Sequence, residues 1–232
     1  MKKPVIFTIG HSTHSFDEFL ELLRAYNIKE IVDVRSIPKS RHNPQFNSDT
    51  LKQSLQRVHI RYKLLKKLGG LRHTKKDSIN VGWHNTSFRG YADYMASPEF
   101  KEGLEALSKI ANVRNAAIMC AEGVPWRCHR SLIADALTKK GWLVRDIMSR
   151  TSATKHRMTP FLKVKKGELV YPASKDTKLS WPVWDLNQKL KNQSYILKHE
   201  IGISVQESSS QPATNFNAFL FQIRSRFLLS LW

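Results

Sequence analysis

The sequence predicts an α/β domain with a mostly parallel sheet, flanked by helices on both faces and followed by a C-terminal extension. Two observations lead to this fold class. Short apolar runs alternate along the chain with segments whose apolar residues recur at helical spacing. These runs are mostly apolar and do not alternate with polar residues, which is typical of parallel strands that are buried on both faces.

Each predicted element has its own local signal. The first predicted helix begins after Ser15, because Glu18 completes a capping box there and apolar residues follow up to about residue 27. A later helix begins at Ser97, an N-cap, with Pro98 in the first helical position. The other predicted helices are 49–58 and 130–140, and the predicted strands are 5–9, 30–34, 60–65, 116–120 and 143–147.

The alternation of strands and helices ends near residue 172. We therefore predict an α/β domain over 1–172, a polar linker-like segment over 173–215 and an apolar C-terminal helix over 216–232. The last segment is interrupted by two arginines, so we expect a docked helix, with a membrane-surface or partner-binding helix as the alternative. No apolar run reaches the roughly 18 residues of a membrane span and no signal-peptide core is visible, so we expect a soluble cytoplasmic protein. Nothing in the pattern sets its oligomeric state.

The chain is strongly basic, with 38 Lys and Arg against 19 Asp and Glu and a formal net charge of +19. Between residues 35 and 76, twelve Lys or Arg stand against a single acid, Asp49. Such clustering is typical of proteins that bind a polyanion, nucleic acid first, although no zinc-finger, RNP or helix-turn-helix signature accompanies it. The alternative is a solvated basic face that binds nothing. The basic residues predicted to contact nucleic acid are Lys39, Arg41, Arg72, Lys75 and Lys76.

Two cysteines are too few for a disulfide framework, so we interpret them as thiols. Cys120 ends a predicted strand, where a small buried residue is common. Cys128 stands at the predicted start of a helix, where the helix dipole and the neighbouring Arg127 and Arg130 favour the thiolate. Cys128 is therefore the predicted nucleophile, and a reversible disulfide between the two cysteines is an alternative.

The carboxyl ends of the predicted strands carry polar and reactive residue types, and ligands gather at that edge of a parallel sheet. His11 is predicted to act as an acid or base, and Glu122 as a general base or as a counter-charge to an arginine. A helix start beside Arg130 is suited to binding a phosphate or carboxylate. The predicted catalytic residues are Cys128, Glu122, His129, His11 and Cys120, and the predicted ligand-binding residues include Ser12, Asp33, Arg35, Tyr91 and Arg130.

No metal or other cofactor is predicted. The weaker alternative is a metal site formed by His11, Glu122, Cys128 and His129, whose spacing is not diagnostic. Aromatic residues near position 90 are predicted to belong to the core, with base stacking as the alternative. The aromatic residues in question are Trp83, Tyr91 and Tyr94.

Six motifs follow one another in a specific order: TIGHS at 8–12, DVRS at 33–36, LGGLR at 68–72, FRGYADYM at 88–95, CAE at 120–122 and CHR at 128–130. In this combination the chain resembles the DUF488 family over about residues 5–172. That family has no assigned function, so the resemblance implies an α/β fold and a site rather than an activity. It also places Arg89 with Tyr91 in the predicted cleft.

The leading hypothesis is a thiol-dependent enzyme that acts on or binds nucleic acid or a phosphorylated small molecule. A non-catalytic nucleic-acid-binding module is the first alternative. The second is a rhodanese-like sulfur or phosphoryl transferase, suggested by Asp33-Val34-Arg35, although Cys120 and Arg127 are further apart than the cysteine and arginine of a rhodanese loop.

Overall fold

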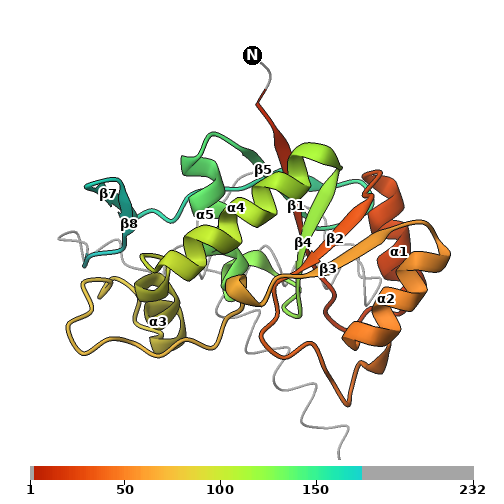
Figure 1. Ribbon diagram of the computed structural model, residues 1–232, viewed down its shortest axis with the longest axis horizontal. Coiled ribbons are helices and arrows are strands. Elements are labelled where there is room, and N and C mark those ends of the chain that lie inside the picture. Colours follow the sequence, from red (N-terminus) through yellow and green to blue (C-terminus); the bar gives the residue numbers. More distant parts are fainter. Residues whose placement is uncertain (1–2, 174–232) are drawn as a thin grey trace, which may run out of the picture. The chain divides into compact units, whose positions relative to one another are not determined.

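The computed structural model describes residues 3–173, which form an α/β domain around one six-stranded sheet (Figure 1). Five strands are parallel, and β6 joins one edge in antiparallel orientation. In spatial order the strands are β3 (Arg61–Leu64), β2 (Glu30–Asp33), β4 (Ala116–Cys120), β1 (Val5–Gly10), β5 (Leu143–Ile147) and β6 (Ala153–Lys155). A separate hairpin consists of β7 (Lys163–Lys165) and β8 (Glu168–Val170).

Helices cover both faces of the sheet, so the predicted fold class is confirmed. Helices α1 (Phe16–Ala25) and α2 (Ser48–Arg57) lie on one face, and α3 (Thr86–Tyr94), α4 (Pro98–Val113) and α5 (Arg130–Lys139) lie on the other (Figure 1). The predicted capping box at Ser15 is present, with Glu18 as its second member. Helix α3 was not predicted.

The strands are held in place by a core that includes residues of β1, β2 and β4 and the apolar faces of α1 and α2. Ile31 and Met119 are completely buried there, together with Phe19 and Leu51 from the two helices. The small residue Ala117 of β4 belongs to the same core and is completely covered by its neighbours. This packing fixes the positions at which the strands end.

The connections of the sheet place a crevice above β4. The chain leaves β1 and β2 toward the face of α1 and α2, but it leaves β4 toward the face of α5 (Figure 1). Since β4 lies between β2 and β1, this reversal opens a space at the carboxyl ends of the three strands. Cys120 is the last residue of β4 and lines the cavity found there.

The predicted segments 173–215 and 216–232 lie outside the described residues, apart from residue 173. Within residues 3–173, no helix combines the length and the apolar character that crossing a bilayer requires.

Candidate functional site

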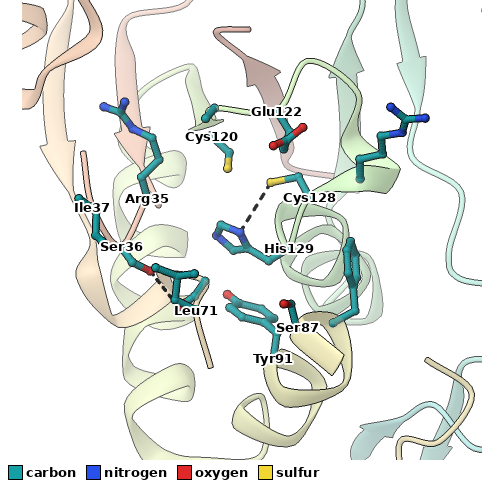
Figure 2. Close-up of a pocket in the computed structure, with 14 residues that line it drawn as sticks. Arg35, Ser36, Ile37, Leu71, Ser87, Tyr91, Cys120, Glu122, Cys128 and His129 are labelled. Atoms are coloured by element: carbon teal, nitrogen blue, oxygen red, sulfur yellow. Dashed lines mark hydrogen bonds between the residues drawn. The ribbon is translucent and has the colours of Figure 1, made fainter. Parts of the chain in front are cut away.

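Two cysteines and a histidine meet at the carboxyl end of β4. After Cys120 the chain passes through the short 3-10 helix Pro125–Arg127 and returns with Cys128 and His129 just before α5. Figure 2 shows both sulfurs and the imidazole ring pointing toward one another. Cys128 Sγ lies 3.6 Å from His129 Nδ1, and one ligand atom from each residue lies within 4.8 Å of the others. Both cysteines are free thiols.

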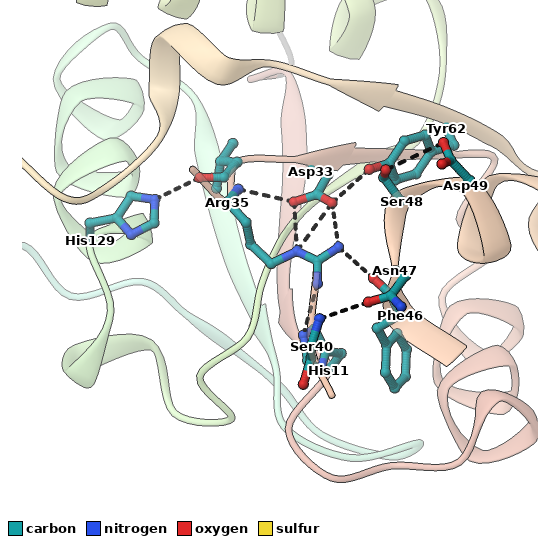
Figure 3. A network of polar contacts seen from close by, with 11 residues as sticks. His11, Asp33, Arg35, Ser40, Phe46, Asn47, Ser48, Asp49, Tyr62 and His129 are labelled. Carbon is teal, nitrogen blue, oxygen red and sulfur yellow. Dashed lines mark hydrogen bonds and ion pairs between the residues drawn. The ribbon is translucent and has the colours of Figure 1, made fainter. Parts of the chain in front are cut away.

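The orientation of His129 is fixed by the backbone of a neighbouring strand end. Its Nε2 lies 2.9 Å from the carbonyl oxygen of Val34, which only accepts hydrogen bonds, so Nε2 carries the proton (Figure 3). In the neutral ring, Nδ1 is therefore an acceptor that faces the sulfurs. Gly70 leaves room for the ring, because a Cβ there would lie 3.0 Å from Nδ1.

The environment favours the thiolate on Cys120 rather than on Cys128. A hydrogen bond from the Cys128 thiol, against the opposing effect of burial, holds the pKa of Cys120 well below its usual value, and His129 and Arg130 lower it further. Burial raises the pKa of Cys128 well above its usual value, and the adjacent Cys120 adds to this effect.

The predicted lowering of the Cys128 pKa is therefore wrong in direction. The helix-start interaction on which it rested does exist, since the backbone N–H of Arg130 donates to Cys128 Sγ at 3.5 Å. One such bond does not offset the desolvation of a sulfur in a residue that is only 3% exposed.

A cavity of about 370 Å³ opens above the sulfurs, within the size range of small-molecule sites. Ile37 and Leu71 also line it and are 66% and 73% exposed, so together they give the cavity an apolar mouth. The ring of Tyr91 forms part of the wall, 4.9 Å from that of His129, and its hydroxyl donates to the carbonyl of Leu68. The other lining residues are Arg35, Ser36, Gly70, Ser87, Phe88, Cys120, Ala121, Glu122, Arg127, Cys128 and His129.

A second cavity, of about 390 Å³, adjoins the first. The two share part of their lining, including Arg35 and Glu122. The Glu122 carboxylate is exposed and makes no hydrogen bond or ion pair to another residue in the described part of the chain. The second cavity is also lined by His11, Ser12 and the basic Lys39.

Several predicted ligand-binding groups hydrogen-bond to one another, although Arg35 also lines both cavities (Figure 3). The buried guanidinium of Arg35 pairs with Asp33, with Nη2 2.6 Å from Oδ2, and also donates to the carbonyl of Phe46. Its Nη1 lies 3.2 Å from His11 Nε2, while His11 Nδ1 lies 2.9 Å from the carbonyl of Ser12. Burial lowers the pKa of His11, so its ring is neutral and both nitrogens have protein partners.

Arg130 also has an internal role. The residue is 1% exposed, and its guanidinium donates to the carbonyls of Glu122 and Gly123 at 2.5 and 2.8 Å. It therefore fixes the loop between the two cysteines. The N-terminus of α5, predicted to bind an anion, is occupied by Cys128, whose carbonyl and sulfur accept the first N–H groups.

The family-based expectation for Arg89 is not matched by its position. Its Nε donates to the carbonyl of Trp83, and it is not among the residues that line either cavity at the strand ends. Trp83 is 3% exposed and stacks on Phe88, so it belongs to the core, as does Tyr91. The guanidinium of Arg72 lies over the ring of Tyr94, with its Cζ 3.7 Å from the ring centre.

The predicted nucleic-acid residues fall into two groups. The exposed side chains of Lys39, Arg41, Lys75 and Lys76 lie on loops. Arg72 is engaged locally, since besides its stacking on a tyrosine its Nε donates to the carbonyl of Gly69.

The alternative metal set is assembled differently from the prediction. The structure groups Cys120, and neither His11 nor Glu122, with Cys128 and His129. Two thiols and an imidazole are suitable ligands for zinc and other thiophilic metal ions.

Sequence reasoning missed the apolar mouth of the cavity and the carbonyl that orients His129. Ile37 directly follows the DVRS motif, and Leu71 lies within LGGLR, so large apolar residues in otherwise polar loops were the available signal. A backbone carbonyl such as that of Val34 leaves no signal in the sequence.

Comparison with known protein families identifies the family of this chain. The model of the "Domain of unknown function DUF488" matches residues 15–137, which is more than half of the chain and includes both cysteines. No curated protein and no solved structure matches the chain.

Proposed function

The chain belongs to the DUF488 family, and from that premise we propose that it is an enzyme whose chemistry is carried by the thiols of Cys120 and Cys128. The substrate is a small ligand with an apolar body and an anionic group. The observation that carries the proposal is the meeting of two sulfurs and an acceptor nitrogen of His129, within 4.8 Å, at the floor of an open cavity.

The reaction that fits this geometry is nucleophilic group transfer. The sulfur of Cys120 attacks a phosphoryl or acyl group of the ligand, forming a bond to sulfur while the bond to the leaving group breaks. The proton that Cys120 gives up to His129 Nδ1 when its thiolate forms passes from there to the leaving group. Water then cleaves the covalent intermediate, which restores the thiol and releases the phosphate or carboxylic acid.

Each remaining part of the site has a role in this scheme. The carbonyl of Val34 holds His129 in the tautomer that accepts a proton at Nδ1. Many enzymes with a nucleophile and a base use a third group to orient the base in this way. The apolar body of the ligand lies against Ile37 and Leu71. Its anionic group faces Arg127, an exposed arginine of the same cavity.

Alkylation by iodoacetamide, followed residue by residue by mass spectrometry, tests the proposal. We expect one of the two thiols in the folded protein to react about tenfold faster than the same cysteine in the urea-unfolded chain at pH 7. Replacing His129 by Asn should remove the acceleration. If both thiols in the folded protein react more slowly than in the unfolded chain, the proposal is wrong.

His59→Asn is the matched control. His59 is exposed and precedes β3, so it lies at the opposite edge of the sheet. Its φ of 59° is in the left-handed region, which Asn tolerates well. This variant should keep the alkylation rates of the unaltered protein.

Nucleic-acid binding is a second candidate, supported by the exposed basic loops. Lys39 lines the second cavity, which adjoins the one above the sulfurs, and Lys75 and Lys76 are exposed on the segment that leads from Leu71 toward α3. Fluorescence anisotropy with single- and double-stranded DNA and RNA should show a Kd that rises steeply with salt.

Charge reversal tests the assignment of those residues. Each lost phosphate contact should reduce the slope of log Kd against log salt by about 1. The double substitution Lys75→Glu and Lys76→Glu should reduce this slope. Lys29 is exposed at the opposite edge of the sheet, so Lys29→Glu should leave the slope unchanged. Absence of binding to all four polymers at low salt would exclude this function.

A further inference from the structure

We propose that Cys120, Cys128 and His129 bind one zinc ion, or a related thiophilic divalent cation, with a fourth coordination position open toward the cavity. The metal site itself does not require the chain to be a thiol enzyme. Its consequence, that the ion blocks both thiols and so regulates them, rests on the proposed function.

The distances between the three groups suit a tetrahedral ion. Zinc lies about 2.3 Å from a thiolate sulfur and about 2.0 Å from an imidazole nitrogen, so two such ligands at the tetrahedral angle are about 3.5 Å apart. Cys128 Sγ and His129 Nδ1 are 3.6 Å apart. Since all three ligand atoms lie within 4.8 Å of one another, small side-chain movements complete the set.

The imidazole is already arranged as a metal ligand. A ligating histidine usually donates its other ring N–H to a carboxylate or a backbone carbonyl, which fixes the tautomer and the ring plane. His129 does so through Nε2 and the carbonyl of Val34, and this leaves Nδ1 free to coordinate beside the sulfurs.

Charge balance also favours a divalent cation. The two cysteines are 6% and 3% exposed, so two thiolates without a counter-ion would be costly there. A divalent cation with two thiolates and a neutral imidazole has no net charge. The N–H of Arg130 that donates to Cys128 Sγ supports the thiolate form of that ligand.

The described residues supply three ligands, whereas structural zinc sites have four protein ligands, so a fourth position is open. One cysteine ends a strand, and the other cysteine and the histidine precede a helix, so rigid elements hold all three. The cavity supplies the remaining side, where water or a substrate group can bind. Glu122, an exposed acid that lines the same cavity, is the candidate to hold a proton of that water.

Cobalt(II) titration of the full chain, reduced with a phosphine and kept free of oxygen, tests the site. We expect one equivalent of Co²⁺ to bind with a sulfur-to-cobalt charge-transfer band and tetrahedral visible bands, and Zn²⁺ to displace it. Cys120→Ser, Cys128→Ser and His129→Asn should each weaken binding at least about tenfold, whereas His59→Asn should not. Circular dichroism shows whether each variant is folded.

An unaltered protein that shows no charge-transfer band, or variants that bind Co²⁺ as tightly as the unaltered chain, would overturn the metal site. Alkylation rates measured with and without Zn²⁺ test the metal site and the proposed enzyme independently. Zinc binding that protects both thiols supports the regulatory role. If the protein binds zinc but its metal-free thiols are alkylated slowly, the metal site stands and the proposed enzyme is refuted. If the thiols are alkylated fast but the protein does not bind zinc, the proposed enzyme stands and the metal site is refuted.

Discussion

The charge on His156 is coupled to folding. Its ring is buried between two carboxylates, with Nε2 2.9 Å from Asp135 Oδ1 and Nδ1 3.5 Å from Asp146 Oδ2. Burial alone would lower its pKa, but the hydrogen bonds and charges of the two aspartates raise the pKa of His156 to about 9. Tyr171 also donates to Asp135, and its own pKa lies well above the usual value, so it stays neutral in the same range.

The size of the effect follows from the two pKa values. The pKa rises from 6.5 in the unfolded chain to about 9 in the folded protein, a difference of about 2.5 pH units, and each unit is worth about 1.4 kcal/mol. Because the folded pKa is the higher one, this stabilisation is complete below pH 6.5 and is lost as the pH rises through 9. We expect His156 to contribute about 3 kcal/mol of unfolding free energy at pH 6 that is absent above pH 9.5.

Urea unfolding at pH 6, 7.5 and 9.5 measures this contribution. In the unfolded chain the two cysteines also titrate within this pH range, so the comparison is with His156→Gln, which retains both of them. The unaltered chain should lose about 3 kcal/mol more than the variant between the extremes. Proton NMR of His156 gives its pKa directly if the variant does not fold. Equal losses in both proteins, or an NMR pKa near 6.5, would refute the reasoning.

Two substitutions test how the site is supported. Gly10→Ala should cost about 3 kcal/mol and should also slow alkylation of the thiols, because its Cβ would lie 1.9 Å from the carbonyl oxygen of Glu122 and displace the loop between the cysteines; unchanged urea midpoints would contradict this. Asp33→Asn should cost about 3–5 kcal/mol, because it leaves the buried guanidinium of Arg35 without a counter-ion. The exposed Asp49→Asn should change stability by less than about 0.5 kcal/mol, and equal effects of the two aspartate variants would show that the pair is not energetically important.

The sheet could be predicted from the sequence because its central strands are rich in apolar residues, and β4 is apolar throughout. Strand β4 is buried at all five positions, and its composition leaves little alternative to a central parallel strand. Helix α3 was missed for the opposite reason. It has nine residues, contains Gly90 and mixes polar with aromatic side chains, so it lacks a clear apolar stripe. A Cβ on Gly90 would lie 2.2 Å from the carbonyl of Arg72, a tertiary requirement that no local pattern reveals.

The site shows a similar division between what is local and what is not. Which strand ends carry reactive residues is a local property, and Cys120, Cys128 and His129 were all identified as candidates. The charge state of each sulfur depends on which groups lie around it in space. Cys128 has the helix start that the sequence indicated, yet its burial outweighs that interaction, and Cys120 gains the hydrogen bond instead.

The arginines of the site follow the same logic. A basic residue beside a strand end suggests ligand binding only if no internal acceptor satisfies it first. Arg35 meets Asp33 two residues away and Arg130 meets the carbonyls of its own loop, so both are used to build the site. The exposed Arg127 has no such partner among the described residues. Burial, more than charge, therefore separates the arginines that shape the cavity from the one that is available to a ligand.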